Sequence, residues 1–211
     1  MAVNLKEIAD PKTTALMLME IQQAVIGKAT PPLFTQLRDS AEKVGLAANA
    51  GKLLRAARTA GVKVFHCPAY HRPGQEGFIT NCRLAQAIKR SDMPMAMGSE
   101  GAEFLPEVEP LQDEIIIWRF HSPTLFHDSS TDSICRNLGI TTVVLTGLSL
   151  NLGIPGSTIE AMNRNYRVVI PTDCVAGYPP EYGEMVLKNT LHGLAYLTTA
   201  KELAEAWGMK A

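Results

Sequence analysis

The chain has 211 residues, an apolar fraction of 46%, a charged fraction of 19% and a formal net charge of −1 at pH 7. This composition is typical of one folded globular domain, which we place at residues 1–211, and it argues against a disordered chain. Acidic and basic residues are interspersed, so no basic stripe is available for a phosphate backbone and we expect no nucleic-acid partner.

The N-terminal half begins with an apolar run at residues 14–20, which is typical of a strand covered on both faces. Apolar residues at helical spacing then predict one helix over residues 33–60, ending before Gly61. Residues 62–67 form the second predicted strand. The stretch 68–110 is rich in proline and is the least regular part of the chain, with one helical segment predicted near 81–89.

The C-terminal half continues the alternation of strands and helices. Further strands are predicted at residues 114–118, 142–145, 167–171 and 196–199. Helices are predicted around residues 132–138, 155–165, 181–194 and 200–207. This order predicts an α/β fold with three layers: a doubly wound, mainly parallel six-stranded sheet with helices on both faces. In such a sheet the active crevice lies beyond the carboxyl ends of the strands, where the strand order reverses.

The cysteines and the N-terminus bear on location. Residues 1–7 have no apolar segment of the kind found in secretory signals, and no apolar run is long enough to span a membrane. The four cysteines, at positions 67, 82, 135 and 174, are scattered and show no C-x-x-C spacing. We therefore expect reduced and mostly buried thiols in a cytoplasmic protein.

The segment 142–158 carries the most informative motif. Its residues Thr146-Gly147, Asn151 and Gly153 follow a predicted strand and open a predicted helix. The segment resembles the isochorismatase-like (cysteine hydrolase) superfamily, in which this strand ends in a T-G-x-x-T-N-x-C-V pattern whose cysteine attacks an amide or thioester carbon. In this chain Gly153 stands at the cysteine position.

The resemblance extends to the other two members of the superfamily's Asp-Lys-Cys triad. Glu20 and Gln22 match a D-x-Q motif at the end of the first strand, so the resemblance implies that Glu20 acts as general acid or base. The third strand of the superfamily ends in K-x-x-x-S-x-F. Counting back four residues from Ser122 places Trp118 at the lysine position, with Arg119 beside it.

Each changed position has a physical consequence. Gly153 supplies no nucleophile, but its N–H at the start of a helix is a potential donor to an anion or oxyanion. A carboxylate at the end of a buried strand needs a partner, and Arg119 and His121 are the cations near Glu20. We expect Arg119 to point to the opposite side of its strand from Trp118. Without a close cation, Glu20 would become a candidate general acid.

The remaining site residues shape the predicted pocket. Trp118 and Phe120 are candidates to line a pocket for a flat ligand. Ser149 and Asn151 are further candidate substrate-binding residues, with N–H groups near Ser149 stabilising negative charge. The resemblance also implies a non-proline cis peptide at Leu148–Ser149. His66 and His71 lack the aspartate of related metal sites, so we expect no metal and no cofactor.

These residues favour a hydrolase that acts on a small, aromatic or cyclic metabolite by acid/base catalysis without a cysteine nucleophile. The candidate catalytic residues are Glu20, Gly153, Arg119 and His121. The resemblance supports this reading, because true isochorismatases also carry glycine at the cysteine position and protonate a vinyl ether. It also implies a homodimer or larger homo-oligomer. The alternatives are a non-catalytic module for small-molecule binding or assembly, and lyase or isomerase chemistry at the same site.

Overall fold

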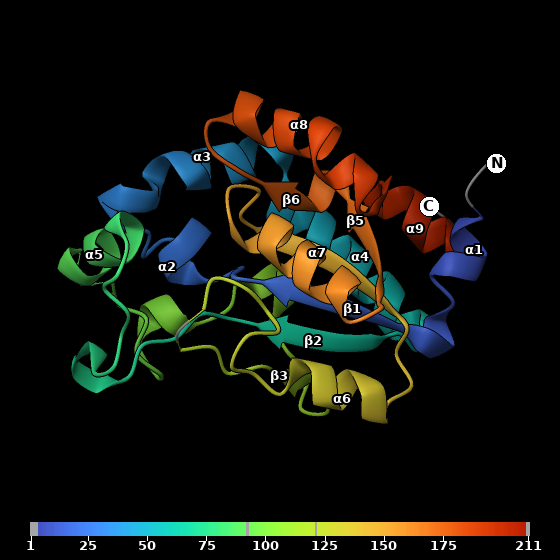
Figure 1. Cartoon of the computed structure of the whole chain (residues 1–211), viewed down its shortest axis with the longest axis horizontal. Helices are drawn as coiled ribbons and strands as arrows, with labels where there is room; N and C mark the ends of the chain where they lie inside the picture. The colour runs from blue at the N-terminus through green and yellow to red at the C-terminus, as the bar shows by residue number, and fades with distance from the viewer. Residues whose placement is uncertain (1–3, 92, 121, 210–211) are drawn as a thin grey trace.

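The computed structural model describes residues 4–91, 93–120 and 122–209, which contain one parallel β-sheet. Its strands follow the order β3-β2-β1-β4-β5-β7, and the short strand β6 pairs with β4 (Figure 1). The strands are β1 (Thr14–Met19), β2 (Lys63–Cys67), β3 (Ile115–Ile116), β4 (Thr142–Leu148), β5 (Arg167–Pro171), β6 (Val175–Ala176) and β7 (Tyr196–Thr198).

Helices connect these strands in the alternating order that a parallel sheet requires. The α-helices are α1 (Leu5–Ile8), α2 (Gln23–Ile26), α3 (Thr35–Val44), α4 (Leu46–Ala60), α5 (Arg83–Arg90), α6 (Thr131–Asn137), α7 (Gly153–Asn163), α8 (Pro180–Asn189) and α9 (Ala200–Ala206). Short 3₁₀ turns lie at Pro11–Thr13, Pro32–Phe34, Pro73–Gln75, Glu100–Ala102, Pro106–Val108, Thr172–Cys174 and Leu191–Gly193.

Two apolar cores lie on the two faces of the sheet, as strand alternation requires. In β1, Leu16 and Leu18 enter the core beneath α4 and α9, whereas Met17 and Met19 enter the core beneath α6, α7 and α8. Figure 1 shows α6, α7 and α8 together on the near side of the sheet. Full burial of one such side chain contributes about 1.5–3 kcal/mol, so the alternation fixes which face each helix covers. The three-layer α/β fold is therefore confirmed.

The six predicted strands are all present, but three details of the prediction are wrong. The helix predicted over 33–60 is divided into α3 and α4 at Gly45, which has a φ of 72°. A left-handed residue ends a helix, and glycine adopts that conformation without a steric penalty. The two-residue strand β6 was not predicted, and β3 is shorter than expected.

The cysteines and the helices agree with two further expectations. All four cysteines are free thiols, and three of them are buried while Cys82 is exposed. Within the described ranges, no helix combines the length and apolar character needed to cross a membrane.

Candidate active site

The carboxyl ends of β1 and β4 form the point at which the strand order reverses, since β1 is followed along the chain by β2 on one side and neighbours β4 on the other. Gly147 of β4 lies opposite Met19 of β1 and has a φ of 95°. A Cβ atom at Gly147 would lie 1.9 Å from the carbonyl oxygen of Met19. Glycine is therefore required here, and it brings the residues that follow both strands together.

Glu20 follows β1 directly and forms an ion pair across the end of β2. Its Oε1 lies 2.8 Å from Nη2 of Arg119, and the two side chains are 21% and 2% exposed, respectively. The backbone of Glu20 has a φ of 56°, a left-handed conformation that is uncommon for residues other than glycine. Such conformations cost about 1–3 kcal/mol and cluster at functional sites. The structure thus holds this carboxylate in place at an energetic cost.

Arg119 is fixed by backbone groups as well as by Glu20. Its Nη1 donates to the carbonyl oxygen of Cys67 at 3.0 Å, and its Nη2 also donates to that of Ser122 at 3.0 Å. Its own carbonyl accepts the N–H of Tyr70 at 2.8 Å. Burying a guanidinium is expensive unless it is paired and hydrogen-bonded, and these contacts meet most of that need. The Nε of Arg119 has no hydrogen-bond partner among the described residues.

Trp118 and Phe120 lie on the other side of this segment, as expected from strand alternation. The rings of Trp118 and Tyr70 stack with centroids 5.0 Å apart, and those of Tyr70 and Phe120 are 6.2 Å apart. The guanidinium of Arg72 lies 4.7 Å from the ring centroid of Phe120. The cation position beside Glu20 therefore belongs to Arg119 and not to Trp118, and the aromatic candidates form a separate cluster with Tyr70.

Gly153 is the first residue of α7 and is buried. A Cβ atom built on it would lie 2.8 Å from the carbonyl oxygen of Leu148, 3.2 Å from that of Pro123 and 3.3 Å from Cε of Met19. The space that a cysteine side chain would need is thus already filled by the backbone and by a methionine. The peptide bond between Leu148 and Ser149 is cis.

Asn151 and Ser149 hold the loops around the start of α7. The side chain of Asn151 accepts the N–H of Tyr178 at 2.9 Å and donates to the carbonyl of the same residue. The carbonyl of Ser149 accepts the N–H groups of Leu152 and Ile154 at 3.2 and 3.0 Å. The contacts of Asn151 thus fix the loop that leads into α8.

A second ionic cluster, which the sequence did not reveal, lies at the start of β3. The Nε2 of buried His66 lies 2.8 Å from Oε2 of Glu114, whose carboxylate also binds Arg58. Burial lowers the pKa of His66, outweighing the opposite effect of Glu114. A hint was available in the sequence, because Glu114 is a charged residue directly before an apolar strand.

The other histidines do not extend the site. His71 packs edge-on against Phe78 with ring centroids 4.7 Å apart, and burial lowers its pKa. His121 lies outside the described residues. Among the residues that are described, no three His, Cys, Asp or Glu side chains are grouped in a way that would hold a metal ion.

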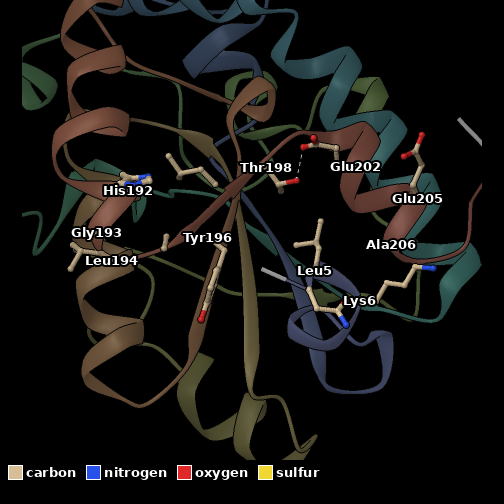
Figure 2. A pocket seen from close by; sticks show the side chains of 13 residues that line it. Leu5, Lys6, His192, Gly193, Leu194, Tyr196, Thr198, Glu202, Glu205 and Ala206 are labelled. Atoms are coloured by element: carbon tan, nitrogen blue, oxygen red, sulfur yellow. Dashed lines mark hydrogen bonds between the residues drawn. The ribbon is translucent and has the colours of Figure 1, made fainter. Parts of the chain in front are cut away.

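Two surface hollows lie away from Glu20. The larger, of about 1000 Å³, runs along β7 between α1, α9 and the segment His192–Ala195, as Figure 2 shows. The smaller, of about 220 Å³, lies between α2, the last turn of α3, the first turn of α4, and Glu107. Neither is lined by Glu20, Arg119 or Gly153, so the candidate site is defined by its polar side chains and not by either hollow.

Comparison with known proteins decides the relationship. A family model described as the isochorismatase domain matches residues 14–202. The chain belongs to the isochorismatase family. In this family member, Glu20, Arg119 and Gly153 follow the carboxyl ends of β1, β3 and β4, respectively.

Individual relatives of this isochorismatase-family chain are distant. Ureidoacrylate amidohydrolase RutB from Pseudomonas syringae pv. syringae is 26% identical over 187 residues, covering 82% of this chain and 75% of the relative. Maleamate amidohydrolase from Pseudomonas putida is 27% identical over 165 residues, covering 76% and 71%. The crystal structure of a cysteine hydrolase from Pseudomonas syringae pv. phaseolicola superposes with a TM-score of 0.79 at 21% identity, covering 94% and 93%.

Proposed function

We propose that this isochorismatase-family protein is a hydrolase that acts on a small metabolite by acid/base catalysis, without a cysteine nucleophile. The observation that carries the proposal is the ion pair between Glu20 and Arg119 at the strand-order reversal, with Gly153 at the start of the neighbouring helix. Two of the relatives are named amidohydrolases, which supports an amide as the bond that is cleaved.

The ion pair favours a general base over a general acid at Glu20. The sequence suggested an acid on the condition that no cation lies nearby, but a guanidinium stays protonated in proteins and pairs with the ionised form of a carboxylate. Arg119 engages Oε1. We assign Oε2 as the atom that accepts a proton from the attacking water. The water oxygen bonds to the carbonyl carbon, the bond to nitrogen breaks, and the proton passes from Glu20 to the leaving nitrogen.

Gly153 fits a role as donor. As the first residue of an eleven-residue helix, it lies where N–H groups and the helix dipole favour negative charge. In the proposed reaction, N–H groups near Ser149 and Gly153 stabilise the oxyanion that forms when water adds. The closed space around Gly153 agrees with direct attack by water, since it leaves no room for a covalent thioester.

One observation favours the alternative of a non-catalytic binding module. The place of the family nucleophile is filled by the carbonyl oxygen of Pro123 and by Met19. A scaffold that has lost catalysis would tolerate such filling, because no reacting group needs the space. In that case the Glu20–Arg119 pair binds a ligand but turns nothing over.

The test is a screen of small amides, esters and vinyl ethers with the wild type and with Glu20→Gln. General acid–base groups contribute roughly 10²–10⁴-fold, so kcat should fall by about that factor in the variant. Glu181→Gln, an exposed glutamate of α8, serves as the control and should leave kcat unchanged. Full turnover by Glu20→Gln would remove Glu20 from its role. Inhibition by thiol reagents that persists in Cys82→Ser would contradict a mechanism without cysteine.

A further inference from the structure

Gln22 belongs to the same sequence motif as Glu20, but the proposed reaction gives it no part. It is fully buried, and a buried amide is costly unless it is hydrogen-bonded. Its Nε2 donates to the carbonyl oxygens of Ala69 at 3.2 Å and of Ala102 at 3.1 Å. Its Oε1 accepts the N–H of Ala69 at 2.8 Å. The side-chain amide of Gln22 is thus bonded entirely to backbone groups.

The two bonds to Ala69 continue the pairing of β1 with β2 beyond the end of β1. The last backbone bond of that pairing is made by the N–H of Glu20, which donates to the carbonyl of Cys67 at 3.2 Å. Glu20 has a positive φ, which is incompatible with a strand. Ala69 lies two residues beyond Cys67, just as Gln22 lies two residues beyond Glu20. The side chain of Gln22 therefore makes the donor and acceptor contacts with Ala69 that a strand backbone would make.

The segment that Gln22 holds also supports Arg119. Ala69 forms a parallel β-bridge with Arg119. The guanidinium of Arg119 donates to the carbonyl of Cys67 at 3.0 Å, and the same carbonyl accepts the N–H of Glu20. Both partners of the ion pair are therefore attached to the chain at Cys67, and Gln22 fixes that chain two residues further on.

A second pairing follows Glu20 on its C-terminal side. The backbone of Gln22 forms an antiparallel bridge with Phe104, and the N–H of Leu105 donates to the carbonyl of Ile21 at 3.2 Å. The bond from the Gln22 side chain to residue 102 reaches this same segment. Glu20 therefore lies between two paired segments, and the amide of Gln22 bonds to both of them.

We propose that Gln22 is a positioning residue that holds Glu20 in its left-handed backbone conformation and thereby sets its carboxylate against Arg119. The proposal rests on the proposed function, because that function requires the carboxylate to be accurately placed. Gln22 acts through the peptide groups of Ala69, which is bridged to Arg119, and through its own backbone next to the Glu20 turn. Without its amide, the ends of β1 and β2 would lose the contact that fixes their relative position.

The first experiment uses kinetics on the substrate found by the screen. Gln22→Met keeps the length of the side chain but removes its three bonds, and Gln22→Asn withdraws the amide by one methylene. A displacement of about 1 Å can cost about 100-fold in rate, so kcat should fall roughly 10- to 100-fold in both variants. KM should stay close to the wild-type value, because the substrate contacts are unchanged.

Asn49→Leu is the matched control for a loss of stability. The amide of Asn49 also donates to two backbone carbonyls, those of Val44 at 3.3 Å and Asp173 at 3.0 Å. This variant should lower the midpoint of urea unfolding, as the Gln22 variants do, because it too leaves backbone groups without their partners. Its kcat should equal that of the wild type, since Asn49 makes no contact with the residues around Glu20 and Arg119 among the bonds that hold them.

The second experiment needs no turnover. Glycine adopts a φ of 56° freely and alanine does not, so Glu20→Gly should have a higher urea midpoint than Glu20→Ala. In a Gln22→Met background this difference should largely disappear, because the backbone at position 20 can then leave the left-handed region. In an Asn49→Leu background the full difference should remain. Circular dichroism establishes that each protein folds, and Gln22→Asn replaces Gln22→Met if the latter does not.

The two experiments can fail separately. An unchanged kcat in the Gln22 variants, or a fall in kcat that Asn49→Leu reproduces, overturns the positioning role. A glycine–alanine difference that is absent in the wild-type background, or that persists in full without the Gln22 amide, overturns the hold on the Glu20 backbone. Full turnover by Glu20→Gln would instead refute the proposed function, and the urea midpoints would still test Gln22.

Discussion

Two carboxylate–arginine pairs in this protein have the same shortest N···O distance and very different surroundings. Glu20 lies 2.8 Å from Arg119, and Glu114 lies 2.8 Å from Arg58. The carboxylate of Glu114 binds two guanidinium nitrogens, His66 at 2.8 Å and the N–H of Leu111 at 2.9 Å. Glu20 itself has a positive φ, and among the described residues its carboxylate accepts a hydrogen bond from Arg119 alone.

The difference separates a structural carboxylate from a candidate reactive one. Burial alone would raise the pKa of Glu114, but its bonds to Arg58, the Leu111 N–H and His66 together lower that pKa to about 2. Both oxygens of Glu114 accept hydrogen bonds, one at Oε1 and three at Oε2, and these bonds join α4, β2 and the start of β3. In Glu20, by contrast, Oε1 is the oxygen that accepts the bond from Arg119, and the residue has an unfavourable positive φ. A proton acceptor needs a carboxylate that is held in position and has an oxygen available to receive the proton.

The largest change in the free energy of unfolding should come from replacing each of these two carboxylates by its amide. Glu114→Gln breaks a buried charge pair and should lower the free energy of unfolding by about 3 kcal/mol. Glu20→Gln should cost about 1 kcal/mol, because the amide oxygen still accepts the bond from Arg119. Urea denaturation of both variants checks this. Equal losses of unfolding free energy in the two variants would mean that both ion pairs stabilise the fold equally. The distinction between a structural and a reactive carboxylate would then fail.

The pH dependence of the free energy of unfolding should show the structural role of Glu114 directly. The folded-state pKa of Glu114 lies below the usual 4.5, so its contribution is complete above pH 4.5 and is lost as the pH falls toward 2. Between pH 5 and 3 the wild type should therefore lose about 1 kcal/mol more than Glu114→Gln. Urea midpoints measured across that range give both slopes. Parallel curves for the two proteins would show that another carboxylate dominates acid unfolding.

The fold was largely predictable because hydrophobic periodicity is local. The strand at 167–171 has the predicted bounds, since its apolar run is continuous and bounded by Arg167 and Pro171. The break at Gly45 was missed because the apolar spacing of α3 continues into α4, and one glycine inside a helical pattern does not reveal its φ. Strand β6 has two residues and exists through its pairing with β4, a contact that no local pattern encodes.

The site was predictable in part, for the same reason. Motifs at strand ends made Glu20 and Gly153 candidate residues, and strand alternation predicted that Arg119 and Trp118 face opposite sides. Counting back from Ser122 placed Trp118 at the family's lysine position and left Arg119 and His121 as the available cations, and in the structure it is Arg119 that pairs with Glu20. The filling of the space at Gly153 depends on Pro123 and Met19, which are distant in sequence. Such contacts follow from packing and leave no pattern in the chain.

The smallest effect isolates the backbone of Glu20. Glu20→Gly and Glu20→Ala both remove the carboxylate, but glycine adopts a φ of 56° freely whereas alanine does not. Glu20→Gly should therefore be more stable than Glu20→Ala by about 1 kcal/mol in thermal or urea denaturation. The same two substitutions at Glu184, an exposed position in α8, should show the opposite order of stability by a similar amount, because alanine favours a helix.

If the alanine and glycine variants at position 20 are equally stable, the positive φ is not imposed by the fold. The claim that this carboxylate is held at an energetic cost then fails. If Glu20→Gly is the more stable variant and both variants lose turnover, the backbone at position 20 favours glycine for stability whereas activity requires glutamate. At Glu114 the same side chain is expected to serve stability alone.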